Sequence, residues 1–105
     1  MGTFWQAGGQ KDGADLYTEF LRVPSMSAGI YRLAAGSTDP QIPHNEDEVY
    51  YVISGRGRLR VGDAVQQVSA VTIAFVPARE MHRFEDIEED LEILVFFAPA
   101  EAASS

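Results

Sequence analysis

The sequence predicts an all-β domain, and three observations support this fold class. β-branched and aromatic residues recur in short runs, most clearly in residues 49–54 (VYYVIS) and 91–98 (LEILVFFA). Glycine or proline closes these runs at short intervals along the chain. A chain of 105 residues fits one domain with one modest core, so we expect a single barrel or sandwich of short strands over residues 1–105.

Other segments complete the predicted strands. Residues 16–23 and 26–33 are separated by the breaker pair Pro24-Ser25, and residues 71–76 end at Pro77. In residues 59–65, the two-residue linker Gly62-Asp63 stands between alternating apolar and polar residues, which predicts a hairpin. The strand predicted over residues 49–54 is expected to end at Gly55. Residues 86–94 leave two alternatives open, because apolar residues at 87, 91 and 94 have helical spacing but a loop leading into the last strand explains them equally well.

The remaining segments are predicted to be irregular. Residues 34–48 (AAGSTDPQIPHNEDE) contain Gly36, Pro40 and Pro43, so they cannot form a helix, and their length is typical of a loop that carries function. The ends, about 1–12 and 99–105, have the small and polar composition of flexible termini.

Charge and composition exclude several classes of partner. The net charge of −8 repels nucleic acid and anionic membrane surfaces. The chain has no cysteine, so any metal must be held by imidazole and oxygen ligands. Neither a secretory leader nor a membrane span is recognisable, and we expect the protein in the cytoplasm.

The chain has only two histidines, and both stand where a metal site needs them. In an extended chain, His44, Glu46 and Glu48 lie on one face. His82 follows a turn and leads into another strand. Two imidazoles and a carboxylate leave open positions on an octahedral ion, as in non-haem iron sites. A solvated loop histidine at 44 and a structural core histidine at 82 are the alternatives that the pattern alone leaves open.

The spacing of these residues resembles the two motifs of the cupin superfamily, G-x5-H-x-H-x3-E-x6-G and G-x5-P-x-G-x2-H-x3-N. The matching residues are Gly36, His44, Glu48, Gly55, Pro77 and His82. The resemblance extends over residues 36–86. It implies a double-stranded β-helix, or jelly-roll, barrel in a single domain. It also implies His44, Glu48 and His82 as ligands of one divalent transition metal ion, which would be iron, manganese, nickel, copper or zinc.

The chain departs from the family pattern at four positions. Ile42 replaces the first histidine of the first motif, while the two glycines and the asparagine of the second motif are replaced by Val71, Arg79 and Asp86. The open ligand position is left to Glu46, Gln41 or water. In an alternative register, His44 takes the first histidine position and Glu46 becomes the second ligand. We prefer the first register because Gly36, Glu48 and Gly55 then all stay in place.

Several neighbours of the predicted ligands are candidates for a ligand pocket. Tyr50, Val52 and Phe84 share the alternation of the ligand residues on their strands, so we expect them to line an apolar pocket or, for Val52 above all, to belong to the ordinary core. Arg79 is a candidate for the rim of this pocket, and a purely structural role is the alternative.

The expected partners are a small molecule and a second copy of the chain. Arg56, Arg58 and Arg60 are expected on one solvated face, which would suit the acidic surface of a second subunit or, for one arginine, an anionic substrate. Cupins that resemble this chain commonly form homodimers. The apolar pair Phe4-Trp5 would suit strand exchange in such a dimer, or would cover the chain's own barrel.

Three function classes follow from these residues. The first is a small metal-dependent enzyme acting on a small oxygen-bearing molecule, for which the resemblance suggests oxygenase or isomerase/cyclase chemistry. The second is a module that binds a small ligand without turnover. The third is a structural barrel that has lost its metal, and the replacement of the first motif histidine by Ile42 is how such a loss would begin.

Overall fold

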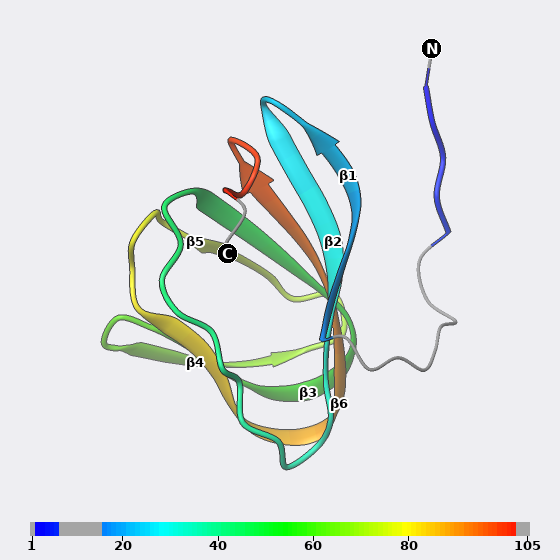
Figure 1. The fold of residues 1–105 in the computed structure, drawn as a ribbon. Coiled ribbons are helices and arrows are strands. Elements are labelled where there is room, and N and C mark those ends of the chain that lie inside the picture. The colour runs from blue at the N-terminus through cyan, green and yellow to red at the C-terminus, as the bar shows by residue number, and fades with distance from the viewer. Residues whose placement is uncertain (1, 7–15, 103–105) are drawn as a thin grey trace.

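The computed structural model describes residues 2–6 and 16–102, and six antiparallel strands form one curled sheet (Figure 1). The strands are β1 (Tyr17–Val23), β2 (Met26–Leu33), β3 (Asp47–Val61), β4 (Ala64–Ser69), β5 (Ile73–Val76) and β6 (His82–Ala98). The order in the sheet is β1-β2-β6-β3-β4, and β5 pairs with β3. The described residues contain no helix, which confirms the predicted all-β class.

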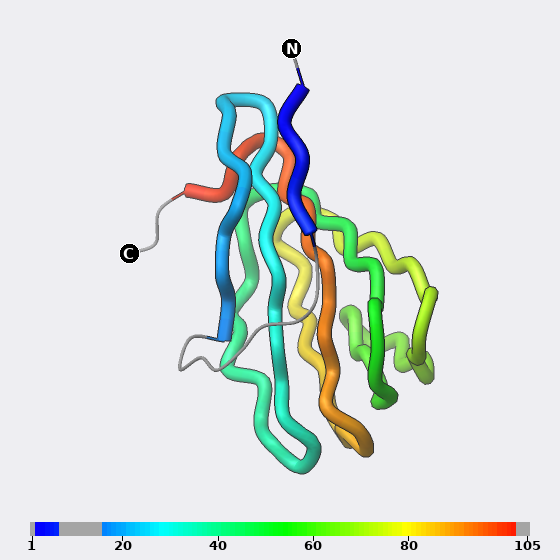
Figure 2. The backbone as a smooth tube through the Cα atoms, turned by 90° about the vertical axis from the view of Figure 1, so that its right-hand side faces the viewer, coloured from blue at the N-terminus to red at the C-terminus, as the bar shows by residue number. Residues whose placement is uncertain are grey.

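The two long strands, β3 and β6, pair along their whole length and bend together (Figures 1 and 2). The register shifts repeatedly between Val52 and Arg58 of β3. Gly55 lies in this bend with φ of 99°, and a Cβ atom there would lie 2.1 Å from the carbonyl oxygen of Asp90, so only glycine fits. The expectation that a strand ends at Gly55 is therefore wrong: the strand continues through the glycine.

The helical spacing in residues 86–94 arises from the same bulges. Ile87 and Leu91 are both buried residues of β6, and the three residues between them are exposed. A bulge inserts residues into a strand, so it lengthens the interval between inward-facing side chains beyond two residues. The alternative of a helical turn in this segment is wrong, because the residues are part of a bent strand.

The inward faces of the bent sheet enclose one hydrophobic core. Its buried side chains come from five strands, and Val52, with 1% of its surface exposed, is one of them. The core members are Tyr31, Leu33, Tyr50, Val52, Leu59, Val68, Val76, Phe84, Ile87, Leu91, Ile93, Val95 and Phe97. The core occupies the barrel interior and leaves one end for polar side chains.

The three residues that replace the glycines and asparagine of the second motif all adopt left-handed backbone conformations. The φ angles are 65° at Val71, 66° at Arg79 and 50° at Asp86. Glycine and asparagine enter this region most readily, whereas a β-branched residue is strained there. The chain thus keeps the backbone of the motif without its residue types. The amide of Arg79 donates a 2.6 Å hydrogen bond to the carbonyl of His44, so this turn anchors the loop that carries His44.

The predicted arginine face is exposed and pairs with acidic residues of the same chain. Arg56 contacts Glu88 at 2.6 Å and Glu89 at 3.0 Å, and Arg60 contacts Glu85 at 3.0 Å. These acids lie on β6, opposite the arginines on β3. The stripe therefore has intramolecular partners, and exposed pairs of this kind contribute little to stability.

The terminal segments are only partly described. Trp5 packs against Phe20 of β1, with the ring centroids 5.0 Å apart, while Phe4 is 92% exposed. Most of the ends expected to be flexible lie outside the described residues. Residues 100–102, however, are tied to the barrel by three backbone amides, which donate to Pro24, Ser27 and Glu46. No helix of the described residues has the length and hydropathy of a membrane span.

Candidate metal centre

Glu48 and His82 form a buried polar pair at one end of the barrel. Glu48 lies on the inner face of β3 between Val76 of β5 and Phe97 of β6, and His82 begins β6. Both side chains are 1% exposed, and Oε1 of Glu48 lies 3.3 Å from Nε2 of His82. The two atoms lack the alignment of a hydrogen bond, and neither has another partner. Burying a polar group without a hydrogen-bond partner destabilises the folded state, so a proton or a cation between these two atoms would stabilise it.

The tautomer of His82 is fixed by the backbone. Its Nδ1 lies 2.9 Å from the carbonyl oxygen of Glu80, which can only accept a hydrogen bond. Nδ1 therefore carries the hydrogen, and in the neutral ring Nε2 presents its lone pair to Glu48. Metal-binding histidines are usually oriented by such a hydrogen bond from the other ring nitrogen.

His44 comes from the loop between β2 and β3 and lies beside this pair. Each of His44, Glu48 and His82 offers one ligand atom, and the three atoms lie within 4.8 Å of one another. Nδ1 of His44 lies 3.2 Å from a carboxylate oxygen of Glu101, and Nε2 lies 3.5 Å from Oε1 of Gln41. The structure thus brings together the three residues expected as ligands.

Gln41, and not Ile42, points into the site from the same loop. The side chain of Ile42 is 72% exposed. The amide group of Gln41 is oriented by Asp39, because Nε2 donates to Oδ2 of Asp39 at 2.8 Å and a carboxylate can only accept. Oε1 of Gln41 then faces inward, where the hydroxyl of Tyr50 donates to it at 3.0 Å. An amide oxygen consequently faces the site from the residue before Ile42, which holds the sequence position of the family's first histidine.

The other predicted site residues lie around the three. The carboxylate of Glu46 is buried but accepts a hydrogen bond from the amide of Ala102 at 3.0 Å, outside the group that shares the ligand geometry. Phe84 is a core residue whose ring packs on Tyr50, with the centroids 4.9 Å apart. The side chain of Arg79 is exposed and does not line the pocket.

Burial changes the acid–base behaviour of the site. It raises the pKa of Glu48 to about 8. It also lowers the pKa of His44, with a further contribution from the charge of His82. The pKa of Glu101 is raised by burial and then by the nearby Glu46. In each case the protein interior disfavours the charged form, and a bound cation would reverse this for the carboxylates.

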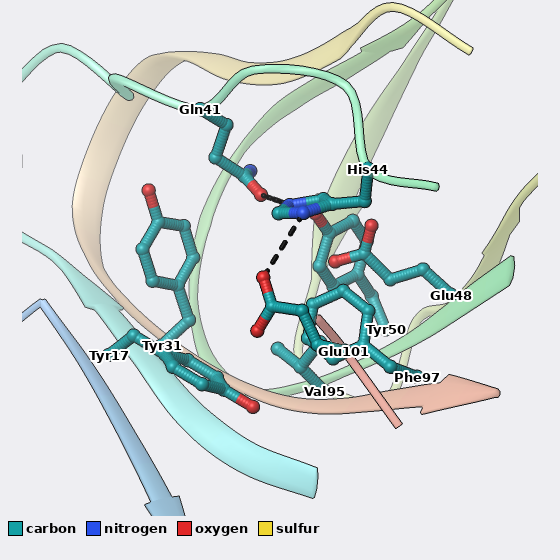
Figure 3. A pocket seen from close by; sticks show the side chains of 9 residues that line it. All are labelled: Tyr17, Tyr31, Gln41, His44, Glu48, Tyr50, Val95, Phe97 and Glu101. Atoms are coloured by element: carbon teal, nitrogen blue, oxygen red, sulfur yellow. Dashed lines mark hydrogen bonds and ion pairs between the residues drawn. The ribbon is translucent and has the colours of Figure 1, made fainter. Parts of the chain in front are cut away.

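A cavity of about 140 Å³ opens beside these residues (Figure 3). Tyr50 lines the cavity, while Val52 and Phe84 belong to the hydrophobic core. The residues around the cavity are Tyr17, Tyr31, Gln41, His44, Glu48, Tyr50, Val95, Phe97 and Glu101. The site therefore combines a candidate cation position with space for a ligand of few atoms.

The donor set fits a divalent transition metal. It consists of imidazole nitrogens and carboxylate or amide oxygens, which suit iron, manganese, nickel, copper and zinc. Cis ligands about 2.1 Å from an ion lie roughly 3.0–3.4 Å apart in octahedral or tetrahedral geometry. The contact between His82 and Glu48 and the contact between His44 and Gln41 have separations close to this range. The unpartnered atoms of Glu48 and His82 are those that an ion would satisfy.

Comparison with known proteins identifies the family. Residues 29–97 match the cupin domain family. The chain belongs to the cupin family. This cupin is 50% identical over 91 residues to the uncharacterised protein SCO3923 of Streptomyces coelicolor, and the match covers 87% of this chain and 85% of the relative.

Solved structures agree with the jelly-roll fold of this cupin. KdgF from Halomonas sp. superposes with a TM-score of 0.72 at 19% identity, over 79% of this chain and 76% of that one. The protein TT1209 from Thermus thermophilus superposes with a TM-score of 0.70 at 22% identity, over 87% and 90% of the two chains. At these identities the likeness concerns the fold alone.

Several residues of the cupin site escaped the sequence analysis, among them Tyr31, Val95 and Phe97, which line the cavity from β2 and β6. Asp39 is buried and accepts hydrogen bonds from the hydroxyl of Tyr31, the side chain of Gln41 and the amide of Phe84. Tyr17 and Glu101 reach the cavity from β1 and from the segment after β6. The only available signals were an aspartate in a loop already expected to be functional and a glutamate that interrupts a tail of small residues.

Proposed function

We propose that this cupin binds one divalent transition metal ion through His44, Glu48 and His82, with Gln41 or water in a fourth position. The observation that carries the proposal is the buried pair of Glu48 and His82, whose facing atoms have no hydrogen-bond partner. The tautomer of His82 leaves the lone pair of Nε2 directed at Glu48. Glu46, the other ligand considered from the sequence, is engaged by the amide of Ala102. We therefore infer that Glu46 holds the C-terminal segment in place and does not bind the ion.

We propose that the centre belongs to a small enzyme of oxygenase or isomerase/cyclase type. A bound ion supplies Lewis acidity toward a substrate oxygen, and a site with two histidines and one carboxylate is also suited to dioxygen activation. The protein contributes the remaining chemistry. Tyr50 and Gln41 orient polar groups of a ligand at the cavity wall, and the rings of Tyr17, Tyr31 and Phe97 limit the access of water.

Metal content in matched variants tests the proposal. Untagged wild-type protein is expected to carry close to one metal ion per chain by elemental analysis, whereas Glu48→Gln and His82→Ala lose it. Glu46→Gln is the matched control, since it removes a buried carboxylate two residues away and should keep the metal. Circular dichroism establishes that each variant is folded. A wild type that stays metal-free in excess divalent ions, or equal loss from the two glutamate variants, overturns the assignment.

Turnover separates the enzyme from the binder. With the native metal in place, consumption of dioxygen or of a small hydroxy- or oxo-substrate is expected for wild type and lost in His82→Ala. A panel of such substrates without any consumption would leave a metal-bearing binding module as the function.

A metal-free binding barrel is the second candidate, and the pKa of Glu48 favours it. With a pKa near 8, Glu48 is largely protonated at neutral pH, so the buried carboxyl group is neutral without an ion. The proton then neutralises the Glu48 carboxylate, as a bound metal ion would in the first candidate. The cytoplasmic location expected from the sequence stays a prediction under both functions.

We infer that the partner is a second copy of the chain, seated on the outer face of β5 and β3. Ile73 and Phe75 of β5 are 69% and 58% exposed. They lie directly opposite Tyr51 and Val49 on β3, which in turn face Leu94 and Phe96 on β6. This continuous apolar face is typical of a subunit contact.

A further inference from the structure

The walls of the cavity are rich in acceptors and aromatic rings and include two acidic side chains. Glu48 and Glu101 contribute carboxylates, and none of the described residues that line the cavity is lysine or arginine. Four of the lining side chains are the aromatic rings of Tyr17, Tyr31, Tyr50 and Phe97 (Figure 3). An anionic or strongly electron-rich ligand would find no positive protein group here.

The hydrogen-bond donors around the cavity are already engaged, with one exception. The hydroxyl of Tyr31 donates to Asp39, that of Tyr50 donates to Gln41, and the amide nitrogen of Gln41 donates to Asp39. The hydroxyl of Tyr17 is the exception, because it is buried without a partner. A neutral ligand that needs several donors is therefore poorly matched to these walls.

The sequence makes room for the Tyr17 ring. Gly29 lies inside β2, where glycine is unfavourable, and a Cβ atom there would lie 2.4 Å from the Tyr17 ring. The ring of Tyr17 meets Tyr31 at 62° and Phe97 at 80°, with centroids 6.4 and 6.2 Å apart. The three rings thus form steeply angled walls and not a stack, which is the arrangement of an aromatic cage.

Glu101 contributes a carboxylate to the lining of the same cavity. Its backbone amide is held by Ser27, and one of its oxygens contacts His44. Its side chain is only 21% exposed, so its charge is poorly screened by water. Aromatic faces beside a partly buried carboxylate attract an organic cation. The net charge of −8 raises the local concentration of such a ligand further.

We propose that the cavity binds a small organic cation, with a methylated ammonium group between Tyr17, Phe97 and Glu101 and an oxygen function directed toward His44 and Glu48. The inference names the ligand class of the metal centre and rests on the proposed function for the oxygen end alone. The volume of about 140 Å³ lies well below the roughly 300 Å³ at which pockets take drug-sized ligands, so the cation has few atoms.

Isosteric probes separate charge from shape. Choline and 3,3-dimethylbutan-1-ol have the same shape, but choline has a positively charged nitrogen where the alcohol has a neutral carbon. Glycine betaine and 3,3-dimethylbutanoate form a second pair that differs in the same way. Titration calorimetry on the full-length protein, with its metal content measured, is expected to give choline an affinity about tenfold or more above that of its isostere.

Variants locate the preference. Tyr17→Leu and Glu101→Gln should each reduce the ratio of the choline and isostere affinities by roughly fivefold. Glu89→Gln removes an exposed carboxylate that pairs with Arg56 and does not line the cavity, and it should leave the ratio unchanged. Thermal unfolding shows which variants are folded, and Glu101→Gln, which keeps the size of the side chain, answers the question if Tyr17→Leu does not fold.

The two probe pairs distinguish failure of this inference from failure of the metal proposal. The choline preference should persist in His82→Ala, whereas binding of betaine, whose carboxylate needs the ion, should be lost. A choline preference without any metal or betaine binding overturns the metal centre and supports the cation site. Equal affinities for choline and its isostere, or a preference unchanged in both Tyr17→Leu and Glu101→Gln, overturn the cation site whatever the metal content.

Discussion

Nε2 of His82 and Oε1 of Glu48 face each other at 3.3 Å inside the barrel, both unpartnered. Nδ1 of His82 donates a hydrogen bond to the carbonyl oxygen of Glu80. Nε2 of the neutral ring and Oε1 of an ionised Glu48 therefore both present lone pairs to each other. A proton and a metal ion therefore compete for the same pair of atoms.

The stability of the metal-free protein should fall as the pH rises from about 4.5 to 8. Burial raises the pKa of Glu48 from 4.5 to about 8, so the folded state holds this proton more tightly than the unfolded state does. The stabilisation is complete below the unfolded pKa and is lost as the pH passes the folded one. Since one pKa unit corresponds to about 1.4 kcal/mol, the loss is on the order of a few kcal/mol. Urea unfolding of chelator-treated protein measures it.

Glu48→Gln is the control for this pH dependence. The variant lacks the titrating group, so the difference between its stability profile and that of the wild type isolates Glu48. Saturating metal ion should reverse the slope, because the ion binds the ionised carboxylate. Identical profiles for wild type and variant between pH 4.5 and 8 would refute the assignment of the raised pKa.

Val71→Gly should stabilise the protein. Val71 is β-branched and holds a φ of 65°, a conformation that costs an L-residue roughly 1–2 kcal/mol and costs glycine nothing. After the entropy cost of a new glycine, the expected gain is about 0.5–1 kcal/mol in the free energy of unfolding. Ala70→Gly, at a neighbouring position with ordinary φ, should lose stability. The prediction fails if the two glycine variants change stability alike.

The fold could be read from the sequence because it depends on local signals. Alternation, breakers and motif spacing indicated most of the strands and singled out the candidate ligands His44, Glu48 and His82, which lie close together in the structure. The bend at Gly55 was misread as an end, because a glycine that ends a strand and one that allows a bulge look the same in sequence. The distinction depends on Asp90, whose backbone passes against Gly55 from another strand.

The rest of the site depends on long-range contacts that no local pattern reveals. Glu101 meets His44 only because the chain beyond β6 is tied back over the barrel end. Gln41 lines the cavity while its neighbour Ile42 is exposed, and Asp39 holds this loop through hydrogen bonds from residues of β2 and β6. Such arrangements follow from the assembled sheet.

Asp39→Ala should be strongly destabilising. Asp39 is 4% exposed, and its carboxylate accepts hydrogen bonds from three segments of the chain. Removal of the carboxylate leaves the amide of Phe84 buried without an acceptor. The expected cost is about 3 kcal/mol in the free energy of unfolding. Glu89→Ala, which removes an exposed carboxylate paired with Arg56, should cost less than about 1 kcal/mol. Equal costs would show that the buried bonds of Asp39 contribute little.

Charged residues on β5 should dissociate the inferred dimer. Ile73→Glu and Phe75→Glu place acids on the apolar outer face and should shift the sedimentation coefficient from that of a dimer to that of a monomer. Val65→Glu, on β4, should leave the dimer intact. A monomeric wild type, or dissociation by Val65→Glu alone, would place the partner elsewhere or remove it.

Anomalous scattering from crystals grown with the native metal tests the metal centre most directly. Data collected on both sides of the absorption edge of the metal should give one strong peak per chain, about 2.1 Å from Nε2 of His82 and from a carboxylate oxygen of Glu48, with an imidazole nitrogen of His44 also within bonding distance. A peak confined to surface carboxylates, or no peak between these three side chains at full metal loading, would contradict the account.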